Sequence, residues 1–425
     1  MNNASLAQWL QRLESLHPQE IELGLERVGA VANTLQLLPV KQPVITVAGT
    51  NGKGSTVAVL EAVLSETGRV TGACTSPHLQ RFNERIRIGG VEVEDAEIIR
   101  AFEQIEVARG SVSLTFFEFA TLAALVVFRN LGVDVVILEV GLGGRLDAVN
   151  IVDASVAVIT SIDLDHEAWL GTTREVIARE KAGIFRAGSP AIVADLNPPG
   201  SLLDCATETD ALGYYIGQDF HVHETADSWR ASLSHPDGTQ RHIFALPWGA
   251  LIVTNVVAAL QALLLAGEKF TDQQVKAALT GIQLPGRREL RKLNGRDYLL
   301  DVAHNPAAVD KLLEYTRLNP CRGKTIALFS AMADKHIHAM IRACGGYFDA
   351  WFLADQPDNP RAAPAEAIAD FLQGEGSPMI NVSDDITQAF RQAQAVMSAG
   401  DRLVVFGSFY TVVNVMEILT RDNVA

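Results

Sequence analysis

The stretch that most constrains the fold is a short apolar run, residues 44–48, followed by a glycine-rich loop and a helix. The run Val-Ile-Thr-Val-Ala predicts a buried strand, and beyond the loop apolar residues recur at helical spacing. The loop contains Gly49, Gly52, Gly54 and Lys53. Glycines let backbone N–H groups turn inward with no Cβ in the way, and these groups, the positive end of the helix and the lysine can together surround a polyphosphate. The stretch therefore predicts a phosphate-binding loop in an α/β protein.

This loop departs from the common pattern G-x-x-x-x-G-K-[ST]. Val47 stands where the first glycine would be, and Gly54 separates Lys53 from Ser55. We therefore expect a variant loop, unlike that of a typical GTPase; the alternative is a strand-to-helix turn that binds nothing. The residues expected to bind the nucleotide are Thr50, Asn51, Gly52, Lys53, Gly54 and Ser55.

The composition limits the classes of partner. With 425 residues the chain is too long for one ordinary core, so two or three domains are expected. The formal net charge of −15 argues against nucleic acid or an anionic membrane as a partner, although a nucleotide needs only local positive potential. Four scattered cysteines without a C-x-x-C pair, no signal-peptide pattern and no apolar run of about 18 to 20 residues indicate a cytoplasmic protein.

Apolar runs that alternate with helical stretches predict two parallel α/β sheets. In the first part of the chain, residues 135–140 and 156–160 are predicted to be central strands, and one helix is expected to run up to Lys181. From residue 298 strands and helices alternate again, which predicts a second, smaller parallel sheet.

The boundary between the two sheets is expected where the pattern resets, around residues 284–288. We therefore expect a P-loop-containing ATP-binding domain, residues 1–286, with a parallel sheet. A smaller Rossmann-like α/β domain, residues 287–425, is expected to follow it.

Polar side chains follow several predicted strands, at the edge where ligands gather in open α/β sheets. Glu139, His166 and Ser76 lie at or just beyond such strand ends. A carboxylate beside a bound nucleotide most often holds Mg²⁺, whereas imidazole is a less usual ligand for this ion. The alternative for Glu139 is a paired charge at a sheet edge. Lys181, at a helix end, would ordinarily be solvated.

A second polar group lies in the smaller domain. In residues 301–306, Asp-Val-Ala-His-Asn-Pro, an acid ends a strand and a His-Asn-Pro turn opens a helix. Asp301 could accept a hydrogen bond from a ribose or an amine, and His304 could contact phosphate or an activated substrate. The alternative is that Asn305 simply caps the helix, and both can hold at once. Arg287 follows a glycine, and a guanidinium fork there suits phosphate or carboxylate.

Six motifs in this chain resemble those of a known family. They are residues 49–55, 75–79, 138–147, 165–166, 180–183 and 301–306. Together they resemble the folylpolyglutamate synthases of the Mur ligase superfamily, and they are most similar to the bacterial bifunctional dihydrofolate synthase/folylpolyglutamate synthases. The resemblance runs from about residue 20 to the C-terminus.

The resemblance implies an ATP-dependent amide ligase. ATP would phosphorylate a carboxylate of 7,8-dihydropteroate or of a reduced folate, and the amine of L-glutamate would attack the resulting acyl phosphate. A carboxylate is a poor acylating agent, and phosphorylation supplies a good leaving group. Two domains that close would keep water away from this intermediate.

The resemblance also implies roles for individual residues. Lys53 would contact the β- and γ-phosphate oxygens, and Ser76, Glu139 and His166 would ligate Mg²⁺. Lys181 matches a lysine that is carbamylated in the family and then holds a second divalent ion; K⁺ is a further candidate ion. Lys53, Lys181 and His304 would be the catalytic residues.

Further positions are implied to contact the substrates. Asn255, Arg287 and Asp301 would contact ATP across the domain boundary, and the loop at Ser330 would help His304 to position glutamate. The residues implied to lie against the pterin are Glu22, Leu23, Gly24, Thr115, Phe116, Phe117, Glu118, Leu146, Asp147 and Ala148.

The sequence leaves three alternatives to a bifunctional ligase. The first is a ligase restricted to folate polyglutamylation, although residues 22–27 resemble the bifunctional form. The second is a Mur-type ligase of cell-wall synthesis, against which the folate-type loop and residues 146–147 speak. The third is a nucleotide-binding switch, which would need a guanine-reading motif such as N-K-x-D, and none is present. Family precedent suggests a monomer.

Overall fold

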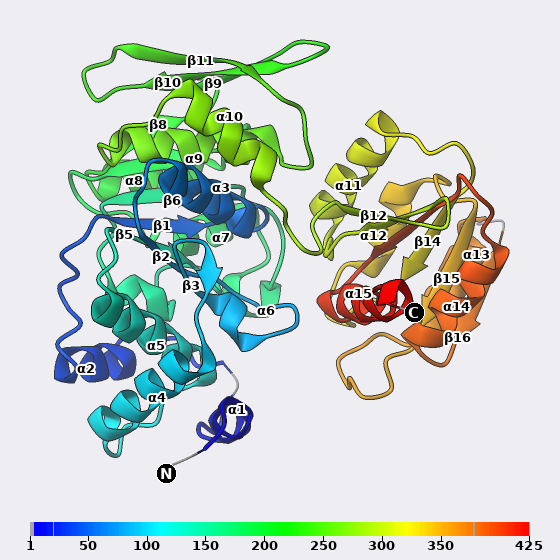
Figure 1. Ribbon diagram of the computed structural model, residues 1–425, viewed down its shortest axis with the longest axis horizontal. Helices are drawn as coiled ribbons and strands as arrows, with labels where there is room; N and C mark the ends of the chain where they lie inside the picture. Colours follow the sequence, from blue (N-terminus) through cyan, green and yellow to red (C-terminus); the bar gives the residue numbers. More distant parts are fainter. Residues whose placement is uncertain (1–3, 20, 377–378, 425) are drawn as a thin grey trace. The chain divides into compact units, whose positions relative to one another are not determined.

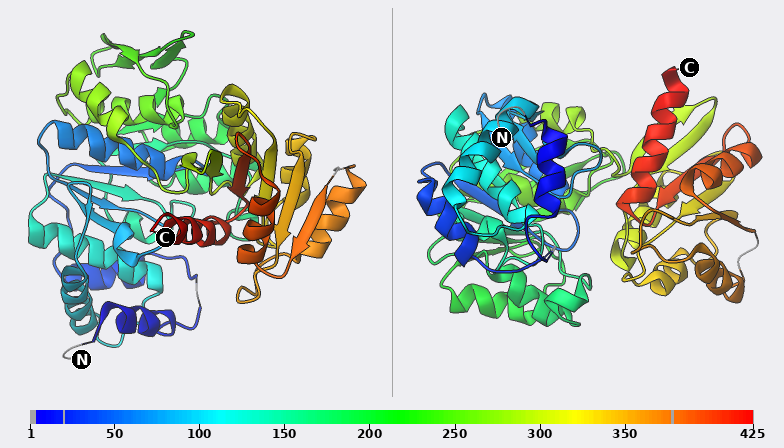
Figure 2. Two further views of the ribbon diagram at one scale, coloured as in Figure 1. Left: turned by 45° about the vertical axis from the view of Figure 1, so that its right-hand side comes forward. Right: turned by 90° about the horizontal axis from the view of Figure 1, so that it is seen from below.

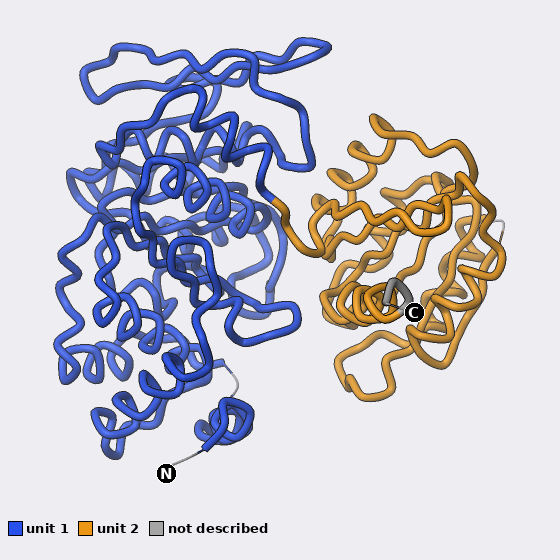
Figure 3. Tube along the Cα trace, in the orientation of Figure 1, with its two compact units in different colours: residues 1–282 blue, residues 283–425 orange. Residues whose placement is uncertain are grey.

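The computed structural model describes residues 4–19, 21–376 and 379–424. The chain divides into two compact units, residues 1–282 and residues 283–425 (Figure 3). The change between them falls a few residues before position 286, where the sequence pattern places the end of the first domain. Among the described residues, no helix combines the length and the apolar character that a membrane crossing requires.

An eight-stranded sheet forms the centre of unit 1 among the described residues (Figure 1). Its order is β4-β3-β2-β5-β1-β6-β7-β8. The strands are β1 (Val44–Ala48), β2 (Thr71–Cys74), β3 (Ile86–Ile88), β4 (Val91–Glu92), β5 (Val135–Glu139), β6 (Val156–Ile159), β7 (Pro190–Val193) and β8 (Leu212–Tyr215). All neighbours are parallel except at one edge, where β3 runs antiparallel to β2 and β4 runs antiparallel to β3. The β-branched runs therefore occupy the middle of a parallel sheet, as predicted.

The central strand β1 is buried on both faces because its side chains alternate between two cores. Ile45 and Val47 pack into one hydrophobic cluster, whereas Val44 and Ala48 pack into the other. The first cluster lies under α3 (Lys53–Glu66), α9 (Val253–Leu265) and α10 (Asp272–Gly281), and the second under α4 (Asp95–Arg109) and α5 (Phe116–Leu131), on opposite faces of the sheet (Figure 1). This double burial holds the loop after β1 on a rigid base.

The remaining elements of unit 1 surround this sandwich. The helices are α1 (Leu6–Glu14), α2 (Glu26–Thr34), α6 (Glu167–Leu170), α7 (Arg174–Ala182) and α8 (Gly200–Glu208), with the 3₁₀ turns η1 (Phe82–Arg85) and η2 (Ala148–Ile151). A small antiparallel sheet of β9 (His221–Glu224), β10 (Trp229–Ser234) and β11 (Gln240–Leu246) packs beside α9 and α10 (Figure 2).

The prediction of one helix running up to Lys181 is wrong. The structure has two helices, α6 and α7, separated by Gly171, which has a positive φ angle (+96°). A Cβ at Gly171 would lie 2.7 Å from a methyl group of Val176, so the chain turns sharply at a position that only glycine fits.

Unit 2 contains a six-stranded sheet among the described residues, in the order β12-β13-β17-β14-β15-β16. The strands are β12 (Glu289–Leu293), β13 (Arg296–Leu300), β14 (Thr325–Phe329), β15 (Ala350–Ala354), β16 (Ile380–Ser383) and β17 (Arg402–Phe406). The helices are α11 (Pro306–Leu318), α12 (Ile337–Cys344), α13 (Ala365–Gly374), α14 (Ile386–Val396) and α15 (Phe409–Val424). Five of these strands are parallel, which agrees with the predicted parallel sheet, but β16 was not predicted as a strand. The edge strand β12 is antiparallel and was also not predicted, because its sequence is largely polar.

Candidate active site

The loop between β1 and α3 needs glycine at two positions. Gly49 (φ +146°) and Gly52 (φ +91°) both have positive φ angles, which L side chains rarely adopt. A Cβ at Gly49 would lie 1.8 Å from Oγ1 of Thr160, and a Cβ at Gly52 would lie 2.4 Å from Nδ2 of Asn255. Both glycines are therefore required by close neighbours as well as by the turn.

Residues after β6 hold the loop in place. Thr50 N donates to Ser161 O (2.8 Å), Thr160 Oγ1 donates to Asn51 O (2.7 Å), and Asp163 N donates to Thr50 Oγ1 (2.9 Å). Sequence reasoning missed Thr160, Ser161 and Asp163. The available signal was their position, because polar residues that directly follow the strand next to β1 must reach the same sheet edge.

The inside of the loop carries donors suited to a phosphate. Lys53, at the first position of α3, donates from Nζ to Gly49 O (3.0 Å), so its ammonium folds back over the loop. Nδ2 of Asn255, beside Gly52, is buried and has no hydrogen-bond partner among the described residues. A buried amide N–H without an acceptor is unfavourable, and a phosphate oxygen at this place would satisfy it. The loop and Asn255 therefore fit a bound nucleotide.

Two candidate metal ligands lie together next to the loop. Glu139, the last residue of β5, pairs in register with Val47 of β1, so its carboxylate stands at the sheet edge where the loop begins. Ser76 follows β2 on the other side of β5, and Ser76 N donates to Glu139 Oε2 (3.3 Å). Glu139 is only 3% exposed. One carboxylate and one hydroxyl beside phosphates match the way Mg²⁺ is usually held.

His166 lies on the segment that leaves β6. It has a left-handed backbone conformation (φ +53°), stands at the start of α6, and donates from its N–H to Asp165 Oδ1 (2.8 Å). Within the described ranges, no three His, Cys, Asp or Glu side chains form a metal-binding group. The candidate ligands Ser76, Glu139 and His166 therefore do not form a metal site made only of acidic or histidine side chains. Phosphate oxygens and water molecules would have to complete the coordination shell of Mg²⁺.

Lys181 is buried on α7 and is not a solvated lysine at a helix end. Its exposure is 5%, and the chain packs against it at Gly144, whose Cβ would lie 3.0 Å from Lys181 Cα. Burial, followed by the positive charge of Lys53, lowers the pKa of Lys181 to about 7, and the charges of Asp165 and Asp147 limit the fall. A large fraction of this amine is therefore neutral, and hence nucleophilic, near neutral pH.

The pKa of Lys181 predicts a pH-dependent stability. The ammonium has its ordinary pKa of 10.5 in the unfolded chain and about 7 in the folded one, so between these values only the unfolded chain binds the proton. The free energy of unfolding should rise with pH in this window, by up to about 1.4 kcal/mol per pH unit. We expect Lys181→Met to exceed the wild type in stability at pH 7 and this advantage to shrink by roughly 2 kcal/mol at pH 9.

Urea unfolding at pH 7, 8 and 9 in CO₂-free buffer measures this difference. Lys311→Met is the matched control, because the Lys311 side chain is exposed and pairs with Glu314. Its pH profile should run parallel to that of the wild type, and a parallel profile for Lys181→Met would contradict the buried amine.

The three segments implied to contact the pterin lie side by side. Gly24 N donates to Leu146 O (3.3 Å), which joins the first segment to the third. Arg27 Nη2 donates to Glu22 O (3.0 Å) and to Glu118 Oε1 (3.2 Å), which joins the first to the second. These positions, which are far apart in the sequence, therefore belong to one region of unit 1.

Several of these residues have structural partners that explain their burial. Glu118 and Thr115 form a capping box at the start of α5, with Thr115 N donating to Glu118 Oε2 (2.7 Å). Asp147 accepts from Leu142 N (2.8 Å) and Val149 N (3.1 Å) and so braces its own loop. Burial raises the pKa of Asp147 to about 6, and these backbone bonds limit the rise. The rest of the set is Leu23, Phe116, Phe117 and Ala148, of which only Ala148 is fully buried.

In unit 2, the end of β13 carries the second predicted group. Asp301 is half-buried and accepts from Arg288 N (2.9 Å) and Ala303 N (2.8 Å); burial raises its pKa. His304 Nδ1 bonds to Val302 O (2.8 Å). Asn305 Oδ1 accepts from Ala308 N (3.0 Å), which confirms that Asn305 caps α11. Arg287 is placed by a backbone bond, from its N–H to Leu284 O (3.1 Å).

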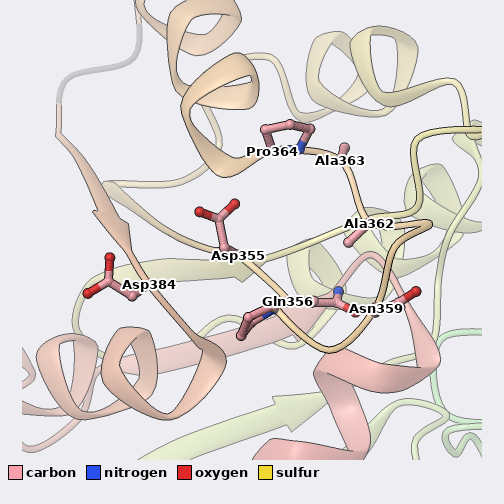
Figure 4. Close-up of a pocket in the computed structure, with 8 residues that line it drawn as sticks. Asp355, Gln356, Asn359, Ala362, Ala363, Pro364 and Asp384 are labelled. Carbon is pink, nitrogen blue, oxygen red and sulfur yellow. Dashed lines mark hydrogen bonds between the residues drawn. The ribbon is translucent and has the colours of Figure 1, made fainter.

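A cavity of about 400 Å³ opens at the carboxyl ends of β15 and β16 (Figure 4). Asp355 follows β15 and Asp384 follows β16, and Gln356 and Asn359 line the same space. Gln356 Nε2 donates to Ser330 Oγ (2.8 Å), which ties the cavity to the loop after β14. Sequence reasoning named Ser330 and missed the cavity, although polar residues after a parallel strand were a usable signal.

The fold and the site are those of an ATP-dependent ligase of the Mur type. Comparison of the sequence with known protein families assigns the chain to the same class. Residues 47–262 match the Mur ligase middle domain, and residues 286–409 match the domain described as Mur ligase, glutamate ligase domain. The chain therefore belongs to the Mur ligase family.

Individual proteins similar to this chain belong to a narrower group within that family. The dihydrofolate synthase/folylpolyglutamate synthase of Escherichia coli (strain K12) is 42% identical over 414 residues, which cover 97% of this chain and 95% of that protein. The solved structure of E. coli FolC in complex with DHPP and ADP matches with a TM-score of 0.93 and 40% identity, covering 99% of each chain. The bifunctional folylpolyglutamate synthase/dihydrofolate synthase from Yersinia pestis, complexed with AMPPNP and Mn ion, matches with a TM-score of 0.91 and 41% identity over 98% of each chain.

Proposed function

We propose that this chain joins the amine of L-glutamate to the carboxylate of 7,8-dihydropteroate and of reduced folates, with ATP as the energy source. The observation that carries the proposal is the phosphate loop, braced at one sheet edge with Ser76 and Glu139 beside it. The similarity to bifunctional relatives over 97% of the chain supports the choice of substrates.

The loop residues prepare ATP for attack. Backbone N–H groups of residues 50–55 hold the phosphates, Lys53 neutralises charge on the β- and γ-oxygens, and Asn255 donates to an oxygen near Gly52. Mg²⁺ on Ser76, Glu139 and His166 would supply further neutralisation of the phosphate charge.

The reaction then proceeds in two steps, phosphoryl transfer and amide formation. A carboxylate oxygen of the acceptor attacks the γ-phosphorus, the bond to ADP breaks, and an acyl phosphate forms. The neutral amine of L-glutamate attacks the carbonyl carbon, inorganic phosphate leaves with the carboxylate oxygen, and the amine loses a proton. The protein contributes alignment of the reacting groups and exclusion of water.

Lys181 provides a further anionic ligand in this proposal. The neutral amine attacks CO₂, which forms an N–C bond, and the loss of a proton leaves a carbamate. Its oxygens would be the ligands of a second divalent ion. The burial that lowers the pKa of Lys181 to about 7 supports this role, because an ordinary ammonium would not react.

The two units have separate tasks in this proposal. Residues 1–286 bind ATP and hold the pterin against the segments joined by Gly24, Arg27 and Leu146. Residues 287–425 position glutamate, with His304 and the loop at Ser330. The enzyme acts as a cytoplasmic monomer.

The test is phosphate release from ATP in the presence of L-glutamate, with 7,8-dihydropteroate and tetrahydrofolate supplied separately. Release with both acceptors, matched by glutamylated products, is the expected result. Release with tetrahydrofolate alone would indicate a folylpolyglutamate synthase without the dihydrofolate synthase activity. Release with neither would contradict the proposed substrates.

Asn255 allows a separate test of the nucleotide site. Nδ2 of Asn255 has no hydrogen-bond partner among the described residues, so Asn255→Ala should cost little stability. The KM for ATP should rise by about tenfold, because one hydrogen bond to a charged group is lost. Gln261 on the same helix is the matched control: its amide exchanges two hydrogen bonds with Ser234 (2.9 and 2.8 Å). Gln261→Ala should lower the unfolding midpoint and leave the KM for ATP unchanged. The opposite pattern would contradict the role of Asn255.

A further inference from the structure

Arg81, Arg85 and Arg87 lie close together, directly before η1, on η1 and on β3. Arg81 and Arg87 form ion pairs with carboxylates of unit 1. Arg81 pairs with Glu92 and Asp95 (3.8 and 3.5 Å). Arg87 forms an ion pair with Glu61, and its Nη1 donates to Thr75 Oγ1 (3.0 Å). Burial lowers the pKa of Arg87, but Glu61 outweighs this effect and the pKa is raised.

Arg85 differs from both in its surroundings. Among the described residues, no carboxylate lies within ion-pair distance of its guanidinium, and its one hydrogen bond runs from Nε to His78 Nδ1 (2.7 Å). Burial lowers its pKa, although the charges of Cys74, Glu139 and Glu84 act in the opposite direction. Arg85 is therefore a half-buried cation, and in the part of the chain that the structure describes its terminal nitrogens bond to no other side chain.

Aromatic rings fix the guanidinium in this place. Its central carbon lies 5.4 Å from the ring centre of Phe116 and 5.8 Å from that of Phe82, both cation–π distances. The two rings meet edge to face at 5.8 Å. The planar fork is thus held in one orientation before any ligand binds, which lowers the entropic cost of binding an anion.

The location connects Arg85 to both parts of the site. Phe116 belongs to the segment proposed to contact the pterin acceptor. Arg85 O accepts from Thr75 N (2.9 Å), one residue before Ser76, and Ser76 N donates to Glu139. Arg85 therefore stands between the acceptor region and the residues beside the phosphate loop.

We propose that Arg85 binds the carboxylate of the acceptor substrate, the group that ATP activates, and orients it for attack. This inference rests on the proposed function. An arginine fork matches a carboxylate through two parallel hydrogen bonds, and no described residue competes for it. The same contact would follow the oxygen atoms when the carboxylate is phosphorylated, since the fork suits both anions.

The test compares two ligands in two proteins. One ligand is 7,8-dihydropteroate, and the other is the same molecule with the carboxylate replaced by hydrogen. Dissociation constants are measured on the full chain with Mg²⁺ and ADP, so that no turnover occurs. We expect Arg85→Gln to weaken dihydropteroate binding by about 10- to 100-fold, the loss of hydrogen bonds to a charged group, and to leave the other ligand unchanged.

Two further variants sharpen the result. Arg85→Lys keeps the charge without the fork and should lose part of the affinity for dihydropteroate, while Arg81→Gln, whose side chain is exposed, should match the wild type with both ligands.

Equal weakening of both ligands in Arg85→Gln would overturn the inference, because the side chain would then only support the aromatic wall. No change with either ligand would overturn it as well. A wild-type protein that binds neither ligand would refute the proposed function before any variant is compared.

Discussion

Glu139→Gln is expected to fold normally and to lose ATP-dependent ligation by about three orders of magnitude. The carboxylate stands at the end of β5 beside Ser76 and the phosphate loop, where it is the one acidic ligand in the candidate metal set. The amide is nearly the same shape and can still accept from Ser76 N, but it cannot supply a negative charge to Mg²⁺. Loss of metal-assisted charge stabilisation is worth several kcal/mol, and each 1.36 kcal/mol is about tenfold in rate.

Turnover at several Mg²⁺ concentrations measures this effect, with the unfolding midpoint as a check on folding. Glu268→Gln is the matched control, since Glu268 is also a buried carboxylate of unit 1 but pairs with Arg69 (3.1 Å), away from the loop. That variant should lose stability and keep its turnover. Full activity of Glu139→Gln at saturating Mg²⁺ would contradict the assignment of this residue as a metal ligand.

Lys181→Met is the second variant for which a large effect is expected, a loss of activity of about 100-fold or more. Removing the amine removes the carbamate and with it the ligand of a second ion, and even the loss of residues that support a metal ligand costs 10- to 100-fold. Methionine fills the buried space with an apolar side chain, so the variant should remain folded.

The dependence on CO₂ distinguishes a carbamate from a simple cation. Wild-type protein assayed in CO₂-free buffer should lose activity and regain it on addition of bicarbonate, whereas Lys181→Met should respond to neither change. Wild-type activity that is independent of CO₂, together with an inactive Lys181→Met, would mean that the amine itself acts at the site.

The sequence predicted those parts of the fold that depend on local patterns. The β-branched runs at β1, β5 and β6 are central strands because their side chains must be buried on both faces, and the glycines after β1 predicted the loop. The same logic placed Ser76 and Glu139 at one sheet edge, and the structure brings Ser76 N within 3.3 Å of Glu139. Strand ends are predictable because parallel strands share one carboxyl edge.

The rest of the site depends on contacts between distant segments. Nothing near Lys181 in the sequence predicts its burial, which arises because the chain at Gly144 packs against α7. Asn255 lies beside Gly52 only because α9 packs against α3, and its role was available from family resemblance alone. Arg85 could not be separated from Arg81 and Arg87 by sequence, since the difference lies in which carboxylates the folded chain brings to each.

The measurement that tests the central claim most directly follows an oxygen atom. 7,8-Dihydropteroate labelled with ¹⁸O in its carboxylate is incubated with the enzyme, ATP, Mg²⁺ and L-glutamate, and the inorganic phosphate is analysed by mass spectrometry. If the carboxylate attacks the γ-phosphorus and the acyl phosphate is then captured by the amine, each phosphate released should carry one ¹⁸O atom. Phosphate without label, or label found in AMP, would contradict activation of the acceptor through an acyl phosphate.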